Sequence, residues 1–310
     1  MIRLKKVILT LLTPLLMMGC SASQENNGRI KILSTTAQIG DLVSAVGGER
    51  VESQVLIRGD LDPHSYEIVK GDGERLQRAT LVFYNGLGLE HGASLSSWLR
   101  ASPKAIAVGE KIAEAHPERI LKKGKVTDPH VWMDISLWQE GISPIVEALS
   151  GADPEGASFY RERGAALGAR MEEAHLALRT QLHKIPPEKR YLVTSHDAFH
   201  YFTRSYLAEP GETNWEDRFA APEGLAPEGQ LNPRDIQKII DHLRAKTISV
   251  LFPESNVSRD SIRKIATAGR ELGLEIRVCS EPLYGDAMSG LSYFEMMKHN
   301  GDTIERYLCD

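Results

Sequence analysis

Two copies of one tripeptide carry the residues of this sequence that are best suited to chemistry. Asp62-Pro63-His64 occurs again as Asp128-Pro129-His130. Proline removes a backbone donor and biases the preceding residue toward extended conformations, so each copy predicts a rigid loop corner that presents an imidazole. Each corner comes after a strand-like run. The pair therefore suggests two histidines directed at one point.

Two further side chains stand at comparable places in the chain. His196 ends the strand-like run of residues 190–195, and Asp286 lies in the loop of residues 283–286. Ligands of open α/β sheets bind beyond the carboxyl ends of the strands, where all four side chains are expected. Three imidazoles and one carboxylate suit a borderline divalent ion such as Zn²⁺ or Mn²⁺ better than Ca²⁺ or Mg²⁺, which prefer oxygen ligands. The sequence thus predicts one metal site formed by His64, His130, His196 and Asp286.

Each of these residues also has a less specific interpretation. A single histidine in a loop is usually a polar surface residue, and Asp-Pro is a frequent turn opener. His200 follows His196 by one helical turn, and we expect it to pack or to support a ligand rather than to bind the ion. The other histidines fall in helical or polar contexts and are expected to be solvated: His91, His116, His175, His183, His242 and His299.

The elements that must position these side chains alternate between strands and helices. In the first half, strand-like runs at 29–33, 51–57, 80–84 and 105–108 alternate with helical patterns at 35–46, 71–78 and 93–99. After the second corner, residues 136–149 predict a helix with Ser136 as its N-cap. Such alternation predicts a parallel sheet covered on both faces.

A long helix and a second alternating segment follow. Residues 155–183 contain no proline and carry Leu167, Met171, Leu178 and Leu182 on one recurring stripe. This pattern predicts a single connecting helix about 40 Å long. The loop at 209–229 has no assignment. We expect an α/β fold with two parallel-sheet lobes, residues 29–153 and 186–310, joined by one long rigid helix at 154–185, with the ligand cleft between the lobes.

The N-terminus has the parts of a secretory signal. Arg3, Lys5 and Lys6 precede an apolar run that closes in Gly19-Cys20, so residues 1–19 predict a signal peptide. The run is shorter than the roughly 20 residues of a membrane span. Cys20 after a small residue is similar to the lipobox of bacterial lipoproteins and predicts lipidation; an ordinary signal with an incidental cysteine is the alternative. Residues 20–28 predict a flexible tether. We expect an exported protein, periplasmic or on the cell surface, held at the membrane by a lipid anchor.

Composition narrows the function further. The 310 residues are 42% hydrophobic and 25% charged, as in soluble globular proteins. The net charge of −5 does not indicate the basic surface that binds nucleic acid. Besides Cys20 there are Cys279 and Cys309, whose pairing the sequence leaves open. No His-Glu-x-x-His, Gly-x-Ser-x-Gly or phosphate-loop motif occurs, so we do not expect an enzyme.

The sequence resembles the periplasmic solute-binding proteins of ABC transporters for zinc and manganese, the cluster A-I (cluster 9) family. Four motifs carry the resemblance. The family's Asp-Pro-His-x-Tyr-Glu and Asp-Pro-His-x-Trp-x-Asp corners match residues 62–67 and 128–134, and its Ser-His-Asp-Ala-Phe-x-Tyr-Phe and Pro-Leu-x-x-Asp stretches match 195–202 and 282–286. Ile68 departs from the family's proline, and the 209–229 loop is longer than expected. The resemblance implies that His64, His130, His196 and Asp286 hold the transported ion.

The resemblance also implies the partners and limits the choice of metal. The partners are a membrane permease with its cytoplasmic ATPase. Manganese-preferring members tend to carry glutamate where His196 stands, and many zinc binders carry a histidine-rich loop where this chain has only His116. These features resemble mixed members of the family, so zinc or manganese is expected and ferrous iron also fits.

Several acidic residues are expected to orient the ligand imidazoles from behind. They are Asp62, Asp128, Asp134, Asp197 and Glu254; for Glu254, which follows a strand-like run, a helix-capping role is the alternative. Trp132 is expected to pack beneath the second corner. Two rival functions remain: a secreted zinc-dependent hydrolase, which usually has only three protein ligands on its zinc, and a surface adhesin lipoprotein of the same fold.

Overall fold

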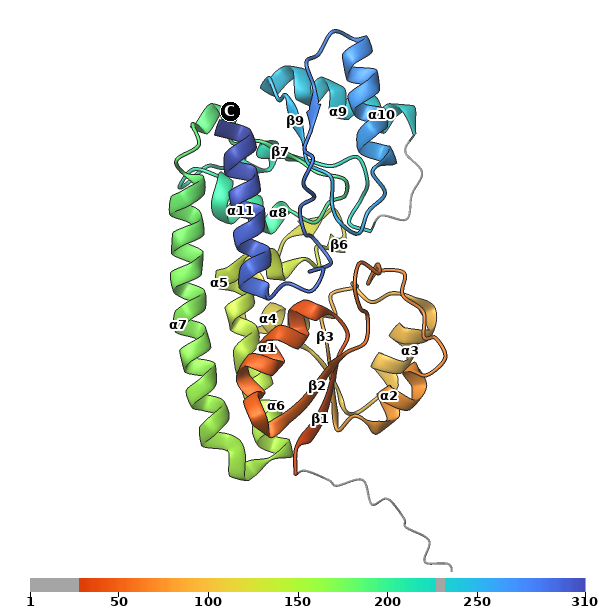
Figure 1. Cartoon of the computed structure of the whole chain (residues 1–310), viewed down its shortest axis with the longest axis vertical. Coiled ribbons are helices and arrows are strands. Elements are labelled where there is room, and N and C mark those ends of the chain that lie inside the picture. Colours follow the sequence, from red (N-terminus) through yellow and green to blue (C-terminus); the bar gives the residue numbers. More distant parts are fainter. Residues whose placement is uncertain (1–27, 227–231, 310) are drawn as a thin grey trace, which may run out of the picture.

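The computed structural model describes residues 28–226 and 232–309, which form two lobes with a long helix along one side (Figure 1). The predicted signal peptide, the lipidation site Cys20 and all but the last residue of the predicted tether lie outside the described residues. Among the helices that are described, none is long and apolar enough to cross a membrane.

The N-terminal lobe is built on a four-stranded parallel sheet in the order β2-β1-β3-β4. Its strands are β1 (Ile30–Ser34), β2 (Val51–Val55), β3 (Leu81–Tyr84) and β4 (Ala105–Ala107). The registers align Ile30 with Val51, Ile32 with Leu81 and Val82 with Ala105. The helices are α1 (Ala37–Gly47), α2 (Asp72–Arg78), α3 (Ala93–Ala101) and α4 (Val108–Ala115). The apolar stripe of α1 is fully buried, which fixes this helix on the sheet.

The segment after the second corner differs from the predicted single helix. It consists of α5 (Ile135–Trp138), a 3₁₀ turn and α6 (Ile142–Ala152). The N-cap is Asp134, not Ser136, because the Asp134 carboxylate accepts bonds from the backbone N–H groups of Ser136 and Leu137. Before the corner, β5 (Lys122–Lys123) and β6 (Val126–Thr127) pair as a short antiparallel ribbon that had not been expected.

The long connecting helix is present as α7 (Ala157–Leu182). Its predicted stripe, which includes Leu167, Met171 and Leu178, is buried against α1, α5, α6 and the last helix, α11 (Tyr293–Cys309). The two helices α7 and α11 lie side by side (Figure 1) and are joined by Gln181, whose Nε2 donates to Asp302 at 2.9 Å and to Glu305 at 2.7 Å.

The described residues of the C-terminal lobe form four very short parallel strands. They are β7 (Leu192–Val193), β8 (Phe219–Ala220), β9 (Val250–Leu251) and β10 (Arg277–Val278). β7 pairs with β8 and β9 with β10, and the N–H of Phe252 donates to the carbonyl of Val193 at 2.9 Å, which joins the two pairs. β8 lies in the loop that had no assignment; residues 227–229 of that loop, and residues 230 and 231 after it, lie outside the described residues.

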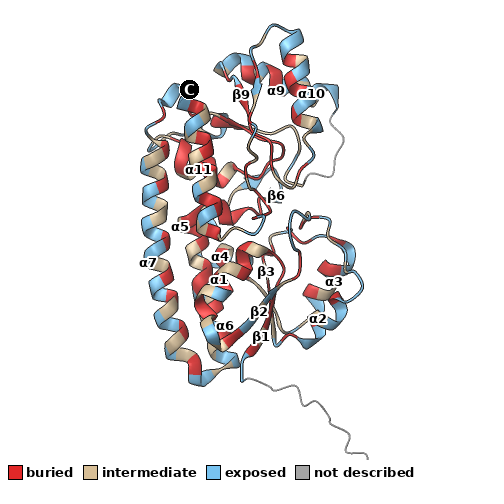
Figure 2. Ribbon diagram, viewed as in Figure 1, coloured by how far each residue is buried: buried red, intermediate tan, exposed pale blue. Residues whose placement is uncertain are grey.

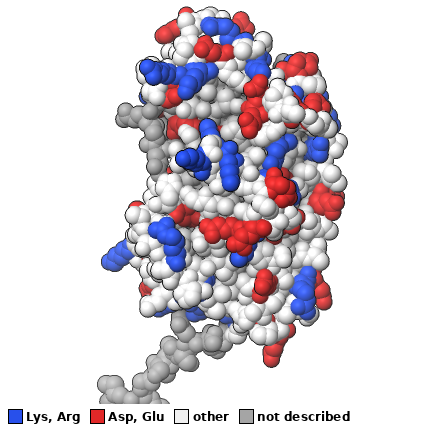
Figure 3. Space-filling view, turned by 180° about the vertical axis from the view of Figure 1, so that it is seen from behind, with Lys and Arg blue, Asp and Glu red and all other residues white. Residues whose placement is uncertain are grey.

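Besides α11, the described helices of this lobe are α8 (His200–Phe202), continued by a π-helix (Thr203–Leu207), then α9 (Pro233–Lys246) and α10 (Asp260–Glu271). The 3₁₀ turns of the described chain are Gly48–Arg50, Pro117–Arg119, Val131–Met133, Gln139–Gly141, Pro154–Gly156, Pro187–Lys189 and Trp215–Arg218. Buried residues lie at the interiors of both lobes and along the inner faces of α7 and α11 (Figure 2). On the face in Figure 3, small groups of both charge signs alternate, in keeping with the modest net charge of −5.

Candidate metal centre

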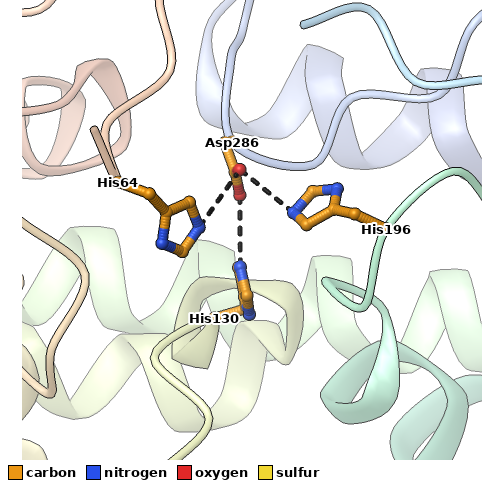
Figure 4. A group of neighbouring side chains, drawn as sticks. All are labelled: His64, His130, His196 and Asp286. Atoms are coloured by element: carbon orange, nitrogen blue, oxygen red, sulfur yellow. Dashed lines mark ion pairs between the residues drawn. The ribbon is translucent and has the colours of Figure 1, made fainter. Parts of the chain in front are cut away.

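The four predicted ligands come from four separate loops and meet at one point (Figure 4). His64 follows β2, and His130 follows β6 at the start of a 3₁₀ turn. His196 follows β7, and Asp286 lies between β10 and α11. The structure thus brings together two loops of the N-terminal lobe and two of the C-terminal lobe.

The geometry of this cluster suits a single ion. Asp286 Oδ2 lies 3.5 Å from His64 Nε2 and 3.1 Å from His196 Nε2, while Asp286 Oδ1 lies 3.4 Å from His130 Nε2. One ligand atom from each residue lies within 4.8 Å of the others. All four residues are buried, the most exposed being Asp286 at 4%.

The ligand atoms themselves indicate what the site can bind. The Nε2 atoms of all three histidines and Oδ1 of Asp286 are buried without a hydrogen-bond partner in the described part of the chain. A buried polar atom left unpaired costs about 1–3 kcal/mol. Four such atoms directed at one point would all be satisfied by one cation, and this donor set fits a transition metal.

The carboxylates around the site stabilise positive charge, whether a proton or a metal ion carries it; although burial lowers the pKa of His196, Glu254 and Asp286 raise it well above its usual value. Burial raises the pKa of Asp286, but the charge of His196 and the contacts with three imidazoles outweigh it and hold this pKa well below its usual range. Burial lowers the pKa of His130, yet Asp128 and Asp286 together raise it to about 9. Burial dominates at His64, whose pKa is lowered. The carboxylate at the centre is therefore ionised at neutral pH.

Two of the predicted supporting carboxylates contact ligand rings. Asp128 Oδ1 lies 2.7 Å from His130 Nδ1 and also accepts the His130 backbone N–H at 3.0 Å. Glu254 Oε2 lies 2.7 Å from His196 Nδ1, an ion pair without the alignment of a good hydrogen bond, and Oε1 accepts the His196 backbone N–H at 2.8 Å. A carboxylate at Nδ1 fixes the ring and leaves Nε2 to face the ion.

For the other three carboxylates, the contacts in the described chain are with groups other than the ligand imidazoles. Asp62 accepts the backbone N–H of His64 at 2.9 Å and fixes the corner rather than the ring. Asp134 caps α5 and contacts Arg119. Asp197 pairs with Lys123 and lies 2.8 Å from His200 Nδ1. Asp62 and Asp128 stand at the same place in their tripeptides, so spacing alone could not separate their roles.

The remaining histidines differ in part from the expectation that they are solvated. His91 is exposed, but His116, His175, His183, His242 and His299 are half-buried. His175 Nδ1 lies 3.0 Å from Tyr206 Oη, and His299 Nε2 lies 2.9 Å from the carbonyl of Pro282. His200 packs edge-on against Phe219 with ring centroids 4.7 Å apart, in keeping with a packing role.

Some contacts near the site carried no signal in the sequence. Asn256 Nδ2 donates to Asp286 Oδ2 at 3.4 Å. Trp132 packs edge-on against His130, with ring centroids 5.3 Å apart, as expected; its Nε1 also donates to the carbonyl of Gly285 at 2.9 Å, which was not. Cys279 and Cys309 are both free.

Fold and site together define a class of protein: a two-lobed α/β binder with a long connecting helix and a buried three-histidine, one-aspartate site. The family described as zinc-uptake complex component A, periplasmic (ZnuA), matches residues 32–307, and the chain belongs to this family.

Individual relatives match over nearly their whole length. Metal-binding protein YtgA of Chlamydia pneumoniae is 39% identical over 287 residues, which cover 91% of this chain and 87% of the relative. Manganese-binding lipoprotein MntA of Bacillus subtilis is 31% identical over 306 residues, 94% of each chain.

Solved structures agree with the fold. The crystal structure of Fe(III)-bound YtgA from Chlamydia trachomatis superposes with a TM-score of 0.86 at 37% identity, covering 90% of this chain and 98% of that one. The periplasmic zinc-binding protein TroA from Treponema pallidum gives a TM-score of 0.81 at 28% identity, covering 91% and 99%. The predicted α/β fold with two lobes and one long helix is thereby confirmed.

Proposed function

We propose that this protein is the extracytoplasmic solute-binding component of an ABC transporter, and that it captures one transition-metal ion at His64, His130, His196 and Asp286. The observation that carries the proposal is the convergence of four buried, unpartnered ligand atoms from four loops. Relatives with the same fold support it, since they are named as metal-binding components of ABC transporters. Delivery would be to a membrane permease served by a cytoplasmic ATPase.

The ligand set favours capture over catalysis. Catalytic zinc usually has three protein ligands and keeps one position open for water or substrate. Here four protein side chains can complete a tetrahedral shell around a buried ion. Because each lobe supplies two ligands, a small local movement of the two ligand loops of one lobe would break half of the shell and release the ion.

The metal would be zinc, manganese or iron. The relatives divide in the same way: MntA is named for manganese, TroA for zinc, and the YtgA crystal structure holds Fe(III). Asp286 adds an oxygen ligand, which suits manganese and iron, whereas the three imidazoles suit zinc.

The experiment is metal analysis of the mature protein purified without chelator, followed by competition among zinc, manganese and ferrous iron. We expect about one ion per chain, as the one cluster found among the described residues implies. His64→Ala and His196→Ala should lose it, while His242→Ala, at a half-buried histidine outside the cluster, should keep it. Unchanged stoichiometry in the first two variants would refute the site, and turnover of a hydrolase substrate would refute the pure binder.

The export and anchoring proposal rests on the first twenty residues. Relatives named as lipoproteins, such as MntA and SloC of Streptococcus mutans, support it. In cells fed labelled palmitate, the wild-type chain should take up label and fractionate with membranes, and Cys20→Ala should do neither. Label on Cys20→Ala would place the lipid elsewhere.

A further inference from the structure

We propose that Trp132 is a positioning residue that fixes the carboxylate of Asp286 and thereby sets the preference of the site for oxygen-seeking metals. The inference rests on the proposed metal-binding function. It concerns the peptide unit just before Asp286, where side chains from both lobes meet.

The loop that carries Asp286 is held from the C-terminal side by α11. The amide of Asn300, fully buried, forms two bonds with the backbone of Tyr284: Oδ1 accepts the N–H at 2.9 Å, and Nδ2 donates to the carbonyl at 2.8 Å. One residue further back, Leu283 pairs with the backbone beside Glu254, the residue that contacts His196. This side of the loop therefore belongs to the rigid part of the C-terminal lobe.

The other side of the loop is held by the N-terminal lobe. Trp132 Nε1 donates to the carbonyl of Gly285 at 2.9 Å, in a fully buried contact. Gln38 Nε2 lies 3.5 Å from the same oxygen, at the limit for a hydrogen bond, so Trp132 provides the stronger bond. The bond joins the residue before one ligand, Asp286, to a residue two places after another ligand, His130.

Trp132 is itself tightly held, so it can act as a fixed point. Its exposed fraction is 2%, its ring packs against the ring of His130, and its carbonyl accepts the hydroxyl of Tyr293 at 2.6 Å. The loop also packs closely on its other side, where Gly285 lies against Glu254. A Cβ there would lie 2.6 Å from Glu254 Oε2, so the peptide is confined between Trp132 and Glu254.

The consequence for metal choice follows from ligand chemistry. Zn²⁺ is well served by imidazole nitrogens, whereas Mn²⁺ depends more on oxygen ligands. Of the four ligand residues, only Asp286 supplies oxygen. A loss of order at Asp286 should therefore weaken Mn²⁺ binding more than Zn²⁺ binding, while a general loss of packing should weaken both equally.

The test compares Trp132→Phe with a matched control, Trp138→Phe. Trp138 is also a fully buried tryptophan, but its Nε1 has no hydrogen-bond partner in the described chain, so the control removes the same volume without removing a bond to the site.

Dissociation constants are measured for Zn²⁺ and for Mn²⁺ with a competing chelator. Outer contacts of metal ligands are worth about 10–100-fold in affinity. We expect Trp132→Phe to raise the Kd for Mn²⁺ by about tenfold or more, with a much smaller rise for Zn²⁺, and Trp138→Phe to leave the ratio of the two constants unchanged.

A second measurement establishes that the effect passes through Asp286. In an Asp286→Ala background, Trp132→Phe should no longer change the ratio, because the carboxylate that Trp132 positions is gone.

If Trp132→Phe does not fold, replacement of Trp132 by its benzothienyl isostere, which lacks the N–H but keeps the ring, should give the same shift in the ratio. Equal losses for both metals, a ratio like that of Trp138→Phe, or a shift that persists without Asp286 would each overturn the inference and leave the proposed function standing. A wild-type chain that binds neither metal would instead overturn the proposed function.

Discussion

At the scale of single residues, the two carboxylates behind the ligand rings differ in how they are arranged. Asp128 uses one oxygen, Oδ1, for both the ring and the backbone of His130. Glu254 divides the two tasks, with Oε2 at the ring of His196 and Oε1 at its backbone. Replacement by the amide should therefore affect the two sites differently.

We expect Glu254→Gln to weaken metal binding by about 10–100-fold and Asp128→Asn to weaken it less. In Glu254→Gln the amide oxygen can still accept the backbone N–H of His196, so the new NH₂ group would face His196 Nδ1. That NH₂ group would donate to Nδ1 and place the ring proton on Nε2, the atom that must be free to bind the ion. The amide oxygen introduced by Asp128→Asn can still serve both bonds of the original carboxylate. Chelator competition with zinc measures both variants, and equal losses would contradict the argument.

A pH prediction follows from Asp153, far from the metal site. Arg50 Nε lies 2.6 Å from Asp153 Oδ2, and the Tyr160 hydroxyl donates to the same oxygen at 2.7 Å. The bond from Arg50 is the main reason that the pKa of Asp153 is lowered to about 2. Burial has a smaller, opposite effect, and the bond from Tyr160 lowers the pKa further. The unfolded chain therefore takes up a proton between about pH 4 and pH 2 that the folded chain does not, so acid removes the stability that this carboxylate contributes.

We expect the free energy of unfolding of the wild type to fall more steeply than that of Asp153→Asn as the pH drops from 5 to 3. The excess loss should be at most roughly 1 kcal/mol, because the unfolded carboxyl is only partly protonated at pH 3 and solvent screens this partly exposed pair. Urea unfolding at the two pH values measures it. Parallel losses in the two proteins would show that the pair does not contribute.

The ligands were predictable from the sequence, but much of what holds them was not. The repeated Asp-Pro-His corner and the strand ends before His196 and Asp286 placed four side chains at one sheet edge. The two tripeptides are identical, so the sequence does not distinguish Asp128, which contacts a ring, from Asp62, whose hydrogen bonds within the described residues are with backbone groups and the Ser65 hydroxyl. The bond from Trp132 to Gly285 spans both lobes, and no local pattern encodes such a contact.

At the scale of elements, the two glycines within α7 both lower its intrinsic helix propensity, but they differ in their contacts with neighbouring residues. A Cβ at Gly164 would lie 2.9 Å from Val146 Cγ2 and 3.0 Å from Ile142 Cγ2 of α6, so the two helices approach closely there. A Cβ at Gly168 would meet nothing nearer than Gln139 at 3.6 Å. The first glycine serves packing, and the second does not.

We expect Gly168→Ala to raise the free energy of unfolding by about 0.5–1 kcal/mol, the ordinary gain of alanine over glycine within a helix. Gly164→Ala has the same intrinsic gain but must displace two branched side chains, which costs about 1–3 kcal/mol, so it should be neutral or destabilising. Denaturant unfolding compares them. A stabilised Gly164→Ala would show that α6 can move away without cost.

Elements were predicted well where they are long and poorly where they are short. α7 has a sustained apolar stripe and was found nearly to its ends. β8 and the β5–β6 ribbon have two residues per strand, too few for any period to show. Aspartate and serine are both good N-caps, so the sequence alone does not decide between Asp134 and Ser136. In the folded loop the Asp134 carboxylate lies at the first N–H groups of α5 and is the N-cap.

At the scale of the whole molecule, the lobes are connected on more than one side of the metal site. α7, about 39 Å long at 1.5 Å per residue, and its neighbour α11 connect them along one side (Figure 1). Closer to the site, Trp132 bonds to Gly285, Ser289 Oγ donates to Asp60 at 2.6 Å, and Lys123 of the β5–β6 ribbon pairs with Asp197. A wide hinge motion would have to break all of these contacts together.

We therefore expect only a small change of shape when the ion binds. Small-angle scattering of the chelator-treated and zinc-loaded protein should give radii of gyration that agree within about 0.5 Å, because a rigid connection permits only local movement of the ligand loops. His196→Ala, which should not hold zinc, controls for effects of zinc on aggregation. Hydrogen exchange adds the local view: amides around His64, His196 and Asp286 should become more protected with zinc, and those of α7 should not change. A clear compaction with zinc, absent in His196→Ala, would show instead that the long helix bends and that the two lobes close as in a hinged binder.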